Sequence, residues 1–199
     1  SGYTSFFLGA RSVCPTATMD VRFTGSWYDQ TLEQEAADAL IDGGCVLISQ
    51  HADSMGAPSA CEAKNIPNVS YNGSTEKECP NTFIVSSRIN WAPYYEYMIN
   101  CVKNGEAIDA DWTGNIDKGS VVLTDVGGAA VEGTQAEIDK VKAELVNGTR
   151  HVFDTSKFTV TVTADQNQNA KVDENGVLTS YMADVDTDAE YTADTEVVK

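Results

Sequence analysis

The stretch Gly44-Cys-Val-Leu-Ile-Ser-Gln-His-Ala-Asp-Ser54 decides the fold, because an apolar run leads directly into a group of polar side chains. Val46, Leu47 and Ile48 predict a buried strand of a parallel sheet. The polar residues at its predicted carboxyl end are Gln50, His51, Asp53 and Ser54. In open α/β sheets, ligands bind outside the carboxyl ends of the strands. The stretch therefore predicts an α/β protein with a ligand-binding cleft.

Capped helices and short strands alternate on both sides of this stretch. Thr31-Leu-Glu-Gln34 is typical of a capping box, and Gly43-Gly44 is expected to end the helix that it begins. Pro93 predicts the first turn of another helix, which Asn104-Gly105 closes. The other predicted elements are helices over 3–13 and 56–64 and strands over 21–24, 45–49, 68–71 and 82–86. This βαβ series predicts a parallel sheet with helices on both faces.

The second half of the chain has a different pattern. A strand is predicted over 121–123, followed by a helix that begins at Thr134 and ends at Asn147-Gly148. The alternating segment 159–163 and a return strand over 177–181 predict an antiparallel hairpin, and the last residues are mostly acidic. We therefore expect an α/β ligand-binding lobe over 1–118 and a terminal segment over 119–199 that ends in a β-rich appendage and an acidic tail.

Charge and hydropathy exclude several classes of function. The 199 residues include 30 acidic and 13 basic side chains, which gives a net charge of −17. Such a chain repels nucleic acid and anionic membranes, and no basic cluster interrupts the negative field. The sequence also contains no apolar run long enough to cross a bilayer.

The cysteines do not follow a metal-binding pattern. None of the five forms a CxxC pair, and the chain has only two histidines, so a structural zinc site is not expected. Cys61 and Cys79 flank a loop rich in Gly, Asn, Ser and Pro, where they either pair as a disulfide or remain packed thiols. The polar segment 165–176 has Ala170 and Gly176 where a calcium loop has Gly and Glu. No metal or cofactor is predicted.

Four separated motifs give the chain a family resemblance. They are Thr24-Gly-Ser-Trp-Tyr-Asp29, Ala39-Leu-Ile-Asp-Gly-Gly-Cys-Val-Leu-Ile-Ser-Gln-His-Ala-Asp-Ser54, Asn90-Trp-Ala-Pro-Tyr-Tyr95 and Asp111-Trp-Thr-Gly114. In this order they resemble the "basic membrane protein" family of ABC-transporter substrate-binding lipoproteins, which includes bacterial purine-nucleoside receptors. The resemblance covers most of residues 1–125 and, more loosely, 158–185. These proteins have two lobes, and this chain resembles the second lobe with its terminal segment.

The resemblance also bears on several candidate ligand contacts along the chain. It places Trp27 against a ligand base, whereas a core position is the alternative. Asp29 either bonds a polar edge or a ribose hydroxyl of the ligand or caps the following helix. Asn72 stands where the nucleoside receptors have an aspartate that holds the ribose hydroxyls, and a turn residue is the alternative. Asn90 and Trp91 open a helix where the family has a lysine or an aromatic near the cleft, and the alternatives are a helix cap and hinge packing.

The polar group after the predicted strand allows two interpretations. Gln50, His51, Asp53 and Ser54 suit hydrogen bonding to a ligand, whereas His51 with Asp53 would suit acid-base catalysis. Catalysis lacks a nucleophile in a strained turn, so hydrogen bonding is favoured. The turn Asp53-Ser-Met-Gly56 also departs from the glycine-rich turn of the nucleoside receptors, which leaves the ligand open.

The expected function is therefore a binding module, without enzymatic activity, for a small nucleoside-like solute. Implied partners are an ABC permease and, through an N-terminal lipid anchor outside these residues, the extracellular face of a bacterial membrane; the periplasm is the alternative location. In the two-lobed protein, helix 92–104 would contact the other lobe. The alternatives are a ligand-sensing regulatory domain of the same fold and, further removed, a hydrolase that uses His51 and Asp53.

Overall fold

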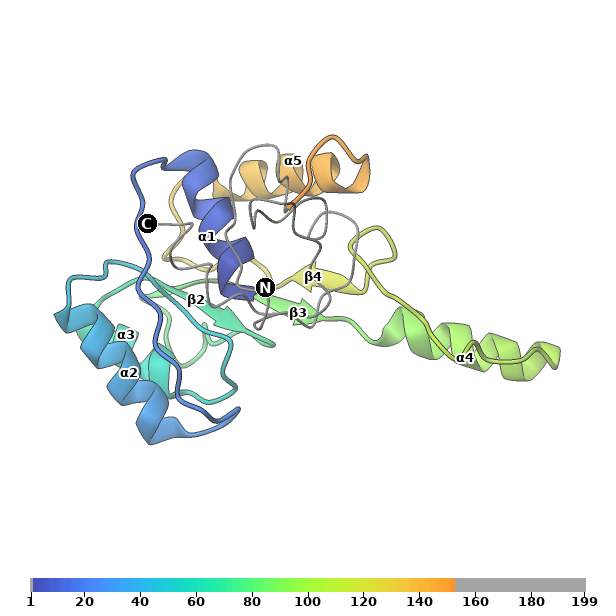
Figure 1. The fold of residues 1–199 in the computed structure, drawn as a ribbon, viewed down its shortest axis with the longest axis horizontal. Helices are drawn as coiled ribbons and strands as arrows, with labels where there is room; N and C mark the ends of the chain where they lie inside the picture. The colour runs from blue at the N-terminus through green and yellow to red at the C-terminus, as the bar shows by residue number, and fades with distance from the viewer. Residues whose placement is uncertain (1, 153–199) are drawn as a thin grey trace, which may run out of the picture. The chain divides into compact units, whose positions relative to one another are not determined.

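A computed structural model describes residues 2–152 of the chain (Figure 1). Its elements in chain order are α1 (Gly2–Val13), α2 (Gln30–Asp42), β1 (Ile48–Ser49), α3 (Gly56–Lys64), β2 (Asn68–Tyr71), β3 (Phe83–Ile89), α4 (Ala92–Asn104), β4 (Val121–Leu123) and α5 (Thr134–Val146). The predicted hairpin over 159–163 and 177–181, the polar loop between its strands and the acidic tail lie outside the described residues.

Residues Arg22–Val146 form one compact unit, and α1 belongs to another. The larger unit contains the whole described sheet and every predicted site residue. The boundary that the sequence predicts near residue 118 falls inside this unit, just before β4 joins the sheet.

The sheet has four strands in the order β1-β2-β3-β4. The first three are parallel, with Ile48 opposite Asn68 and Tyr71 opposite Ser87. β4 runs antiparallel to β3, with Arg88 opposite Val122. The predicted α/β class with a largely parallel sheet is confirmed.

The strand predictions were wrong at the β1 edge of the sheet. β1 contains only Ile48 and Ser49, and residues 21–24 form no strand. Ile48 is buried, but Val46 and Leu47 are 77% and 38% exposed. A strand requires a neighbour with which to share its backbone hydrogen bonds, and a short apolar run cannot indicate whether such a neighbour is in place.

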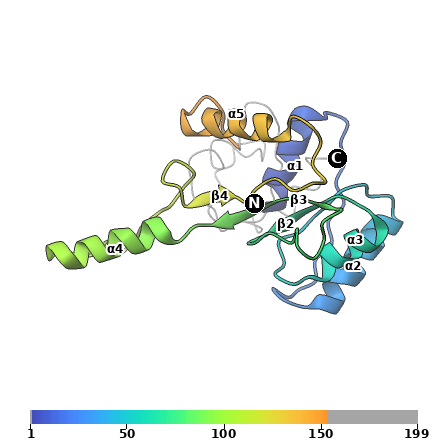
Figure 2. The same ribbon diagram turned by 180° about the vertical axis from the view of Figure 1, so that it is seen from behind.

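Helices α2 and α3 pack against each other and cover one face of the sheet, whereas α5 lies on the opposite side (Figures 1 and 2). Small residues form the contact between α2 and α3: Ala37, Ala57 and Ala60 are buried together. A Cβ added to Gly56 would collide with the carbonyl oxygen of Gln30, so the close approach of these helices requires glycine. The side chain of Lys64 on α3 bridges to two carboxylates of α2.

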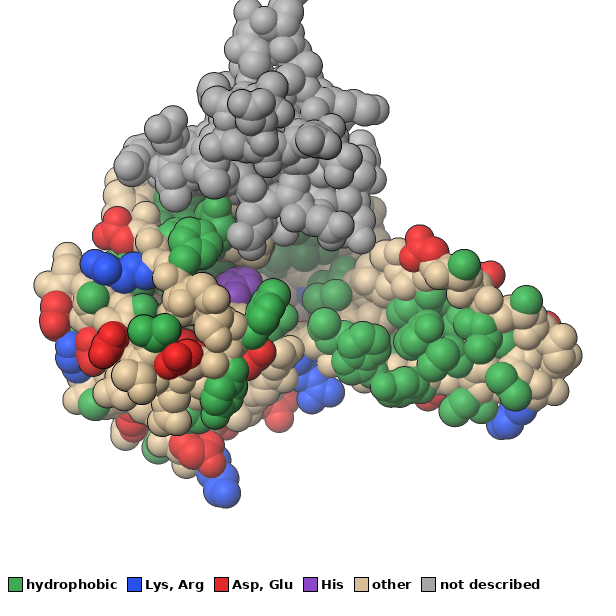
Figure 3. Space-filling view, turned by 60° about the horizontal axis from the view of Figure 1, so that its bottom comes forward, with side chains coloured by type: hydrophobic (Ala, Val, Ile, Leu, Met, Phe, Trp, Pro, Cys, Tyr) green, Lys and Arg blue, Asp and Glu red, His purple; other side chains and the backbone are tan. Residues whose placement is uncertain are grey.

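Residues 90–120 form an arm that leaves the sheet after β3 and returns at β4, and we call it the α4 arm (Figures 1 and 2). Within it, Trp112 packs beside Tyr94 and Tyr97, with ring centroids 5.1 and 6.2 Å apart. The only buried residue of α4 is Cys101. Hydrophobic side chains gather over this helix (Figure 3). Those that are more than half exposed are Trp91, Tyr95, Ile99 and Val102.

Candidate functional site

The loops that follow β1 and β2 meet at the carboxyl ends of these strands. The backbone N–H of Asp53 donates to the carbonyl oxygen of Trp27 at 2.9 Å. The side-chain amide of Asn72 donates to Oδ1 of Asp53 at 3.2 Å. Three predicted site residues from separate parts of the chain are thereby brought together, and we call them the Trp27–Asp53–Asn72 cluster. Trp27 enters this cluster through its backbone carbonyl, and its side chain is 79% exposed.

Backbone geometry fixes the position of Asn72. Its φ of 63° lies in the left-handed region, which asparagine tolerates better than most residues. Its N–H donates to the carbonyl oxygen of Ser87 on β3 at 2.8 Å. Asn72 is therefore both a turn residue and a neighbour of Asp53 in the candidate site. His51 lies next to this group, with its ring centroid 5.5 Å from that of Tyr71. Tyr71 ends β2 just before Asn72, and no motif in the sequence marked it as a site residue.

Three other predicted site residues have local structural roles. Asp29 caps α2, because its carboxylate accepts the N–H groups of Thr31 and Leu32 at 3.1 and 2.9 Å. The cap is thus two residues earlier than the predicted capping box. Gln50 braces its own loop by donating from Nε2 to the carbonyl oxygens of Ala52 and Ser54, both at 3.2 Å.

Ser54 is buried, and its hydroxyl accepts the N–H of Gly56 at the start of α3. Because that hydroxyl is occupied by the helix terminus, Ser54 contributes to the shape of the loop more directly than to a ligand contact. Unlike the Ser54 hydroxyl, the Oε1 of Gln50 is buried without a hydrogen-bond partner in the described part of the chain.

Asn90 and Trp91 lie at the base of the α4 arm. The side-chain amide of Asn90 donates to the carbonyl oxygen of Gly119 at 3.0 Å, and its N–H donates to that of Ser120 at 2.7 Å. Its Oδ1 also accepts the N–H of Ala92 at 3.3 Å. Asn90 thus ties together the two chain segments where the arm leaves the sheet. Trp91 is 55% exposed, with its ring 6.4 Å from Tyr95.

Sequence reasoning gave Glu33 only a place in the predicted capping box. In the structure this residue is 3% exposed. Its Oε1 accepts the N–H of Asp29 at 3.0 Å, and its Oε2 accepts the N–H of Ser54 at 3.2 Å. The carboxylate therefore joins the loop before α2 to the loop after β1. A Glu four residues after Asp29 was the only signal in the sequence.

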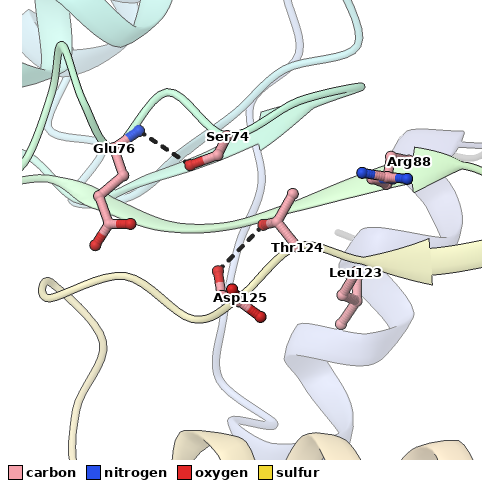
Figure 4. A pocket seen from close by; sticks show the side chains of 6 residues that line it. All are labelled: Ser74, Glu76, Arg88, Leu123, Thr124 and Asp125. Atoms are coloured by element: carbon pink, nitrogen blue, oxygen red, sulfur yellow. Dashed lines mark hydrogen bonds between the residues drawn. The ribbon is translucent and has the colours of Figure 1, made fainter.

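A separate cavity of about 340 Å³ opens beside the loop after β2 (Figure 4). Its lining residues are Ser74, Glu76, Arg88, Leu123, Thr124 and Asp125. Arg88 and Glu76 lie at opposite ends of this cavity, and Asp125 points away from both (Figure 4). The charged groups therefore do not converge on one ligand position.

Cys61 and Cys79 are buried free thiols in the structure. Burial, with the nearby Cys79 and Asp38, raises the pKa of Cys61 to about 12. Burial is also the main cause of the raised pKa of Cys79. The disulfide between them stays a prediction. Across residues 2–152, no three side chains form a metal-ligand group, and no helix is both long and apolar enough to cross a membrane.

The fold and the cluster define an α/β lobe with polar groups at the carboxyl ends of parallel strands. Comparison with known families gives its membership. Residues 1–156 match the family described as ABC transporter substrate-binding protein, PnrA-like. The chain belongs to this family, which confirms the resemblance of its four motifs.

Two relatives carry names that refer to different ligands. A Haloferax volcanii protein named as an ABC transporter glucose-binding protein is 30% identical over 152 residues, which is 76% of this chain and 39% of the relative. A purine-binding protein of Brucella abortus is 36% identical over 104 residues, which is 52% of this chain and 30% of the relative. The chain thus spans less than half the length of each.

Solved structures of similar fold also extend beyond the matched region. An ABC transporter solute-binding protein from Conexibacter woesei has a TM-score of 0.61 at 23% identity, covering 71% of this chain and 48% of that one. A transcriptional activator of the comK gene from Bacillus halodurans has a TM-score of 0.57 at 14% identity, covering 65% and 47%. At these identities the likeness concerns the fold alone.

Proposed function

We propose that this chain is one lobe of the solute-binding component of an ABC transporter and that it grips a nucleoside-like solute without changing it chemically. Trp27 stacks on the base, while Asp53 and Asn72 bond polar groups of the solute. Family membership supports the class of protein, and the name of the Brucella relative supports a purine ring as the ligand.

The observation that carries this proposal is the geometry of the Trp27–Asp53–Asn72 cluster. A flat ring needs an aromatic face, and sugar hydroxyls need acceptors and donors beside it. The exposed indole of Trp27 offers the ring face, and the Asp53–Asn72 pair offers the polar groups; the backbone carbonyl of Trp27 accepts the N–H of Asp53 and so links the two. Asp53 supplies charge-assisted bonding, which a neutral Asn72 alone would lack.

The exposed face of α4 supports a second lobe as part of the complete site. Its aromatic and aliphatic side chains form an apolar surface of the kind that marks an interface. We propose that this face packs against the other lobe and that the hinge formed by β3 and β4 closes both lobes on the solute. The extra length of the relatives provides room for such a lobe.

Partners and location follow from the same proposal. A solute-binding component delivers its ligand to an ABC permease, either as a lipid-anchored protein on the extracellular face of the bacterial membrane or in the periplasm. A regulatory domain is the alternative, because the Bacillus halodurans activator has a similar fold. At such low identity this likeness concerns the fold alone. The family match therefore favours transport over regulation.

A ligand panel tests the proposal directly. Inosine, adenosine and glucose are titrated into the 199-residue chain, and the indole N–H signal of Trp27 and the backbone amide signals of Asp53 and Asn72 are followed by NMR; the two amides remain as reporters in Trp27→Ala. We expect saturable shifts with the nucleosides and about a tenfold loss of affinity in Trp27→Ala, because stacking of a base on an aromatic is worth roughly 1–3 kcal/mol. Tyr28→Ala removes a neighbouring exposed ring and serves as the control. Turnover of a nucleoside, or no response to any of the three probes, would refute the proposal.

A further inference from the structure

The two loops that meet at the candidate site are joined by a carboxylate below them. Glu33 lies in the first turn of α2 and is buried, yet it forms hydrogen bonds with backbone on both sides. One oxygen accepts the N–H of Asp29, and the other accepts the N–H of Ser54. Each of these amides is next to or near a residue of the cluster: Asp29 follows Trp27 by two positions, and Ser54 follows Asp53.

A buried carboxylate without a cation partner is expensive unless backbone dipoles satisfy it. Within the described part of the chain, the Glu33 carboxylate accepts hydrogen bonds from the backbone amides of Asp29 and Ser54. The same two loops are also joined by the backbone hydrogen bond from Asp53 to Trp27, so the carboxylate adds a second, side-chain link beside it. Breaking either bond would leave a buried charge partly unsatisfied, so both loops are held at one separation.

We infer that Glu33 is a positioning residue for solute binding: it does not touch the ligand but sets the spacing between the Trp27 ring and the polar pair Asp53 and Asn72. This inference rests on the proposed function for its binding consequence. Its structural consequence, a fixed relation between the two loops, stands on the hydrogen bonds alone.

The chain offers a matched control for this role. Glu62 on α3 is also a carboxylate that ties a helix to a loop, since it accepts bonds from the backbone and side-chain amides of Asn81 and from the hydroxyl of Thr82. Those residues precede β3, at the end of the sheet opposite to the candidate site. Glu62→Gln therefore perturbs a comparable anchor away from the cluster.

The experiment compares Glu33→Gln with Glu62→Gln by two measurements. The first is ligand-free: amide and indole NMR signals of Trp27, Asp53 and Asn72 are recorded for each folded variant. Glu33→Gln should shift all three, because an amide presents only one acceptor oxygen to two N–H groups. Glu62→Gln should leave them unchanged. If Glu33→Gln does not fold, Glu33→Asp takes its place, since its shorter carboxylate reaches only one loop.

The second measurement is an inosine titration, with the melting temperature of each variant recorded alongside. We expect about a tenfold weaker affinity for Glu33→Gln than for Glu62→Gln. Equal affinities of the two variants, at equal losses of stability, would overturn the positioning role. If inosine fails to bind the wild-type chain, the proposed function fails for this ligand, and the ligand-free signals still decide the inference: unshifted Trp27 and Asp53 signals in Glu33→Gln would refute it.

Discussion

Helices α2 and α4 have the same length but opposite surroundings. Each contains 13 residues. α2 packs on α3 through small buried residues, whereas α4 buries only Cys101 and exposes most of its apolar face. Both sequences carry an apolar stripe and form a helix. Within the described residues, however, other side chains cover the stripe of α2 and leave most of that of α4 exposed. The difference places the covered helix contact in the α2–α3 layer and the exposed apolar face on the α4 arm.

Two isoleucines, Ile48 in the sheet that α2 and α3 cover and Ile99 on α4, give the largest contrast. Ile48→Ala should lower the free energy of unfolding by roughly 2–5 kcal/mol, because it removes a buried side chain and leaves a cavity. Ile99 is 52% exposed, so Ile99→Ala should cost less than about 0.5 kcal/mol. Urea unfolding of both variants measures the difference. Equal losses would mean that the α4 face is covered in the chain as it stands.

The helix contact at Gly56 should respond next most strongly. An added Cβ would collide with the backbone oxygen of Gln30 and lie 2.9 Å from the backbone nitrogen of Gln34. Gly56→Ala should therefore destabilise the unit by roughly 1–3 kcal/mol through overpacking. Gly128 has ordinary space around it, so Gly128→Ala serves as the control. A Gly56→Ala variant as stable as wild type would contradict the close approach of α2 and α3.

The exposed face of α4 should promote self-association of this chain. Ile99 and Val102 are 52% and 71% exposed, and apolar surface of this kind drives contact between molecules. Sedimentation of the wild-type chain should reveal dimers or larger species at high concentration. Replacing both residues by serine should shift the distribution toward monomer without loss of fold. An unchanged distribution would show that this face does not mediate the contact.

The smallest expected effect is a change of stability with pH at Glu62. Its small burial acts to raise the pKa, but hydrogen bonds from Thr82 and Asn81 outweigh this effect and lower the pKa below its usual value of 4.5. The stabilisation is therefore complete above about pH 4.5 and is lost as the pH falls through the lowered value. Glu62→Gln should reduce this loss in urea midpoints recorded from pH 6 to 3. Identical pH profiles for the wild type and Glu62→Gln would show that the hydrogen bonds of the Glu62 carboxylate do not stabilise the fold.

Local signals predicted much of this fold. The helix over 56–64, the strand over 68–71 and the helix begun by Pro93 all agree with the structure, because caps, glycines and periodicity act within a few residues. The absent strand over 21–24 and the short β1 depend on pairing between distant segments, which a short apolar run does not encode.

In the candidate site, too, local signals were predictable and long-range contacts were not. The sequence pointed to Asp53 and Asn72 through their places after predicted strands and to Trp27 through the family resemblance, and the structure brings the three together. It did not reveal the role of Glu33, because a buried glutamate that joins two loops resembles any other first-turn acid on a helix. Nor could it assign Ser54 to the start of α3, since a serine after a strand suits a ligand contact equally well.

The central claim is that the Trp27–Asp53–Asn72 cluster provides one half of a solute grip. An interaction of roughly −8 kcal/mol shared equally between two lobes leaves about −4 kcal/mol for one, which corresponds to millimolar binding. The most direct measurement is the dissociation constant of inosine for the 199-residue chain, with Trp27 as the NMR reporter and sedimentation run in parallel. The account predicts a millimolar constant with shifts centred on the cluster, whereas micromolar binding by a monomeric chain would contradict it.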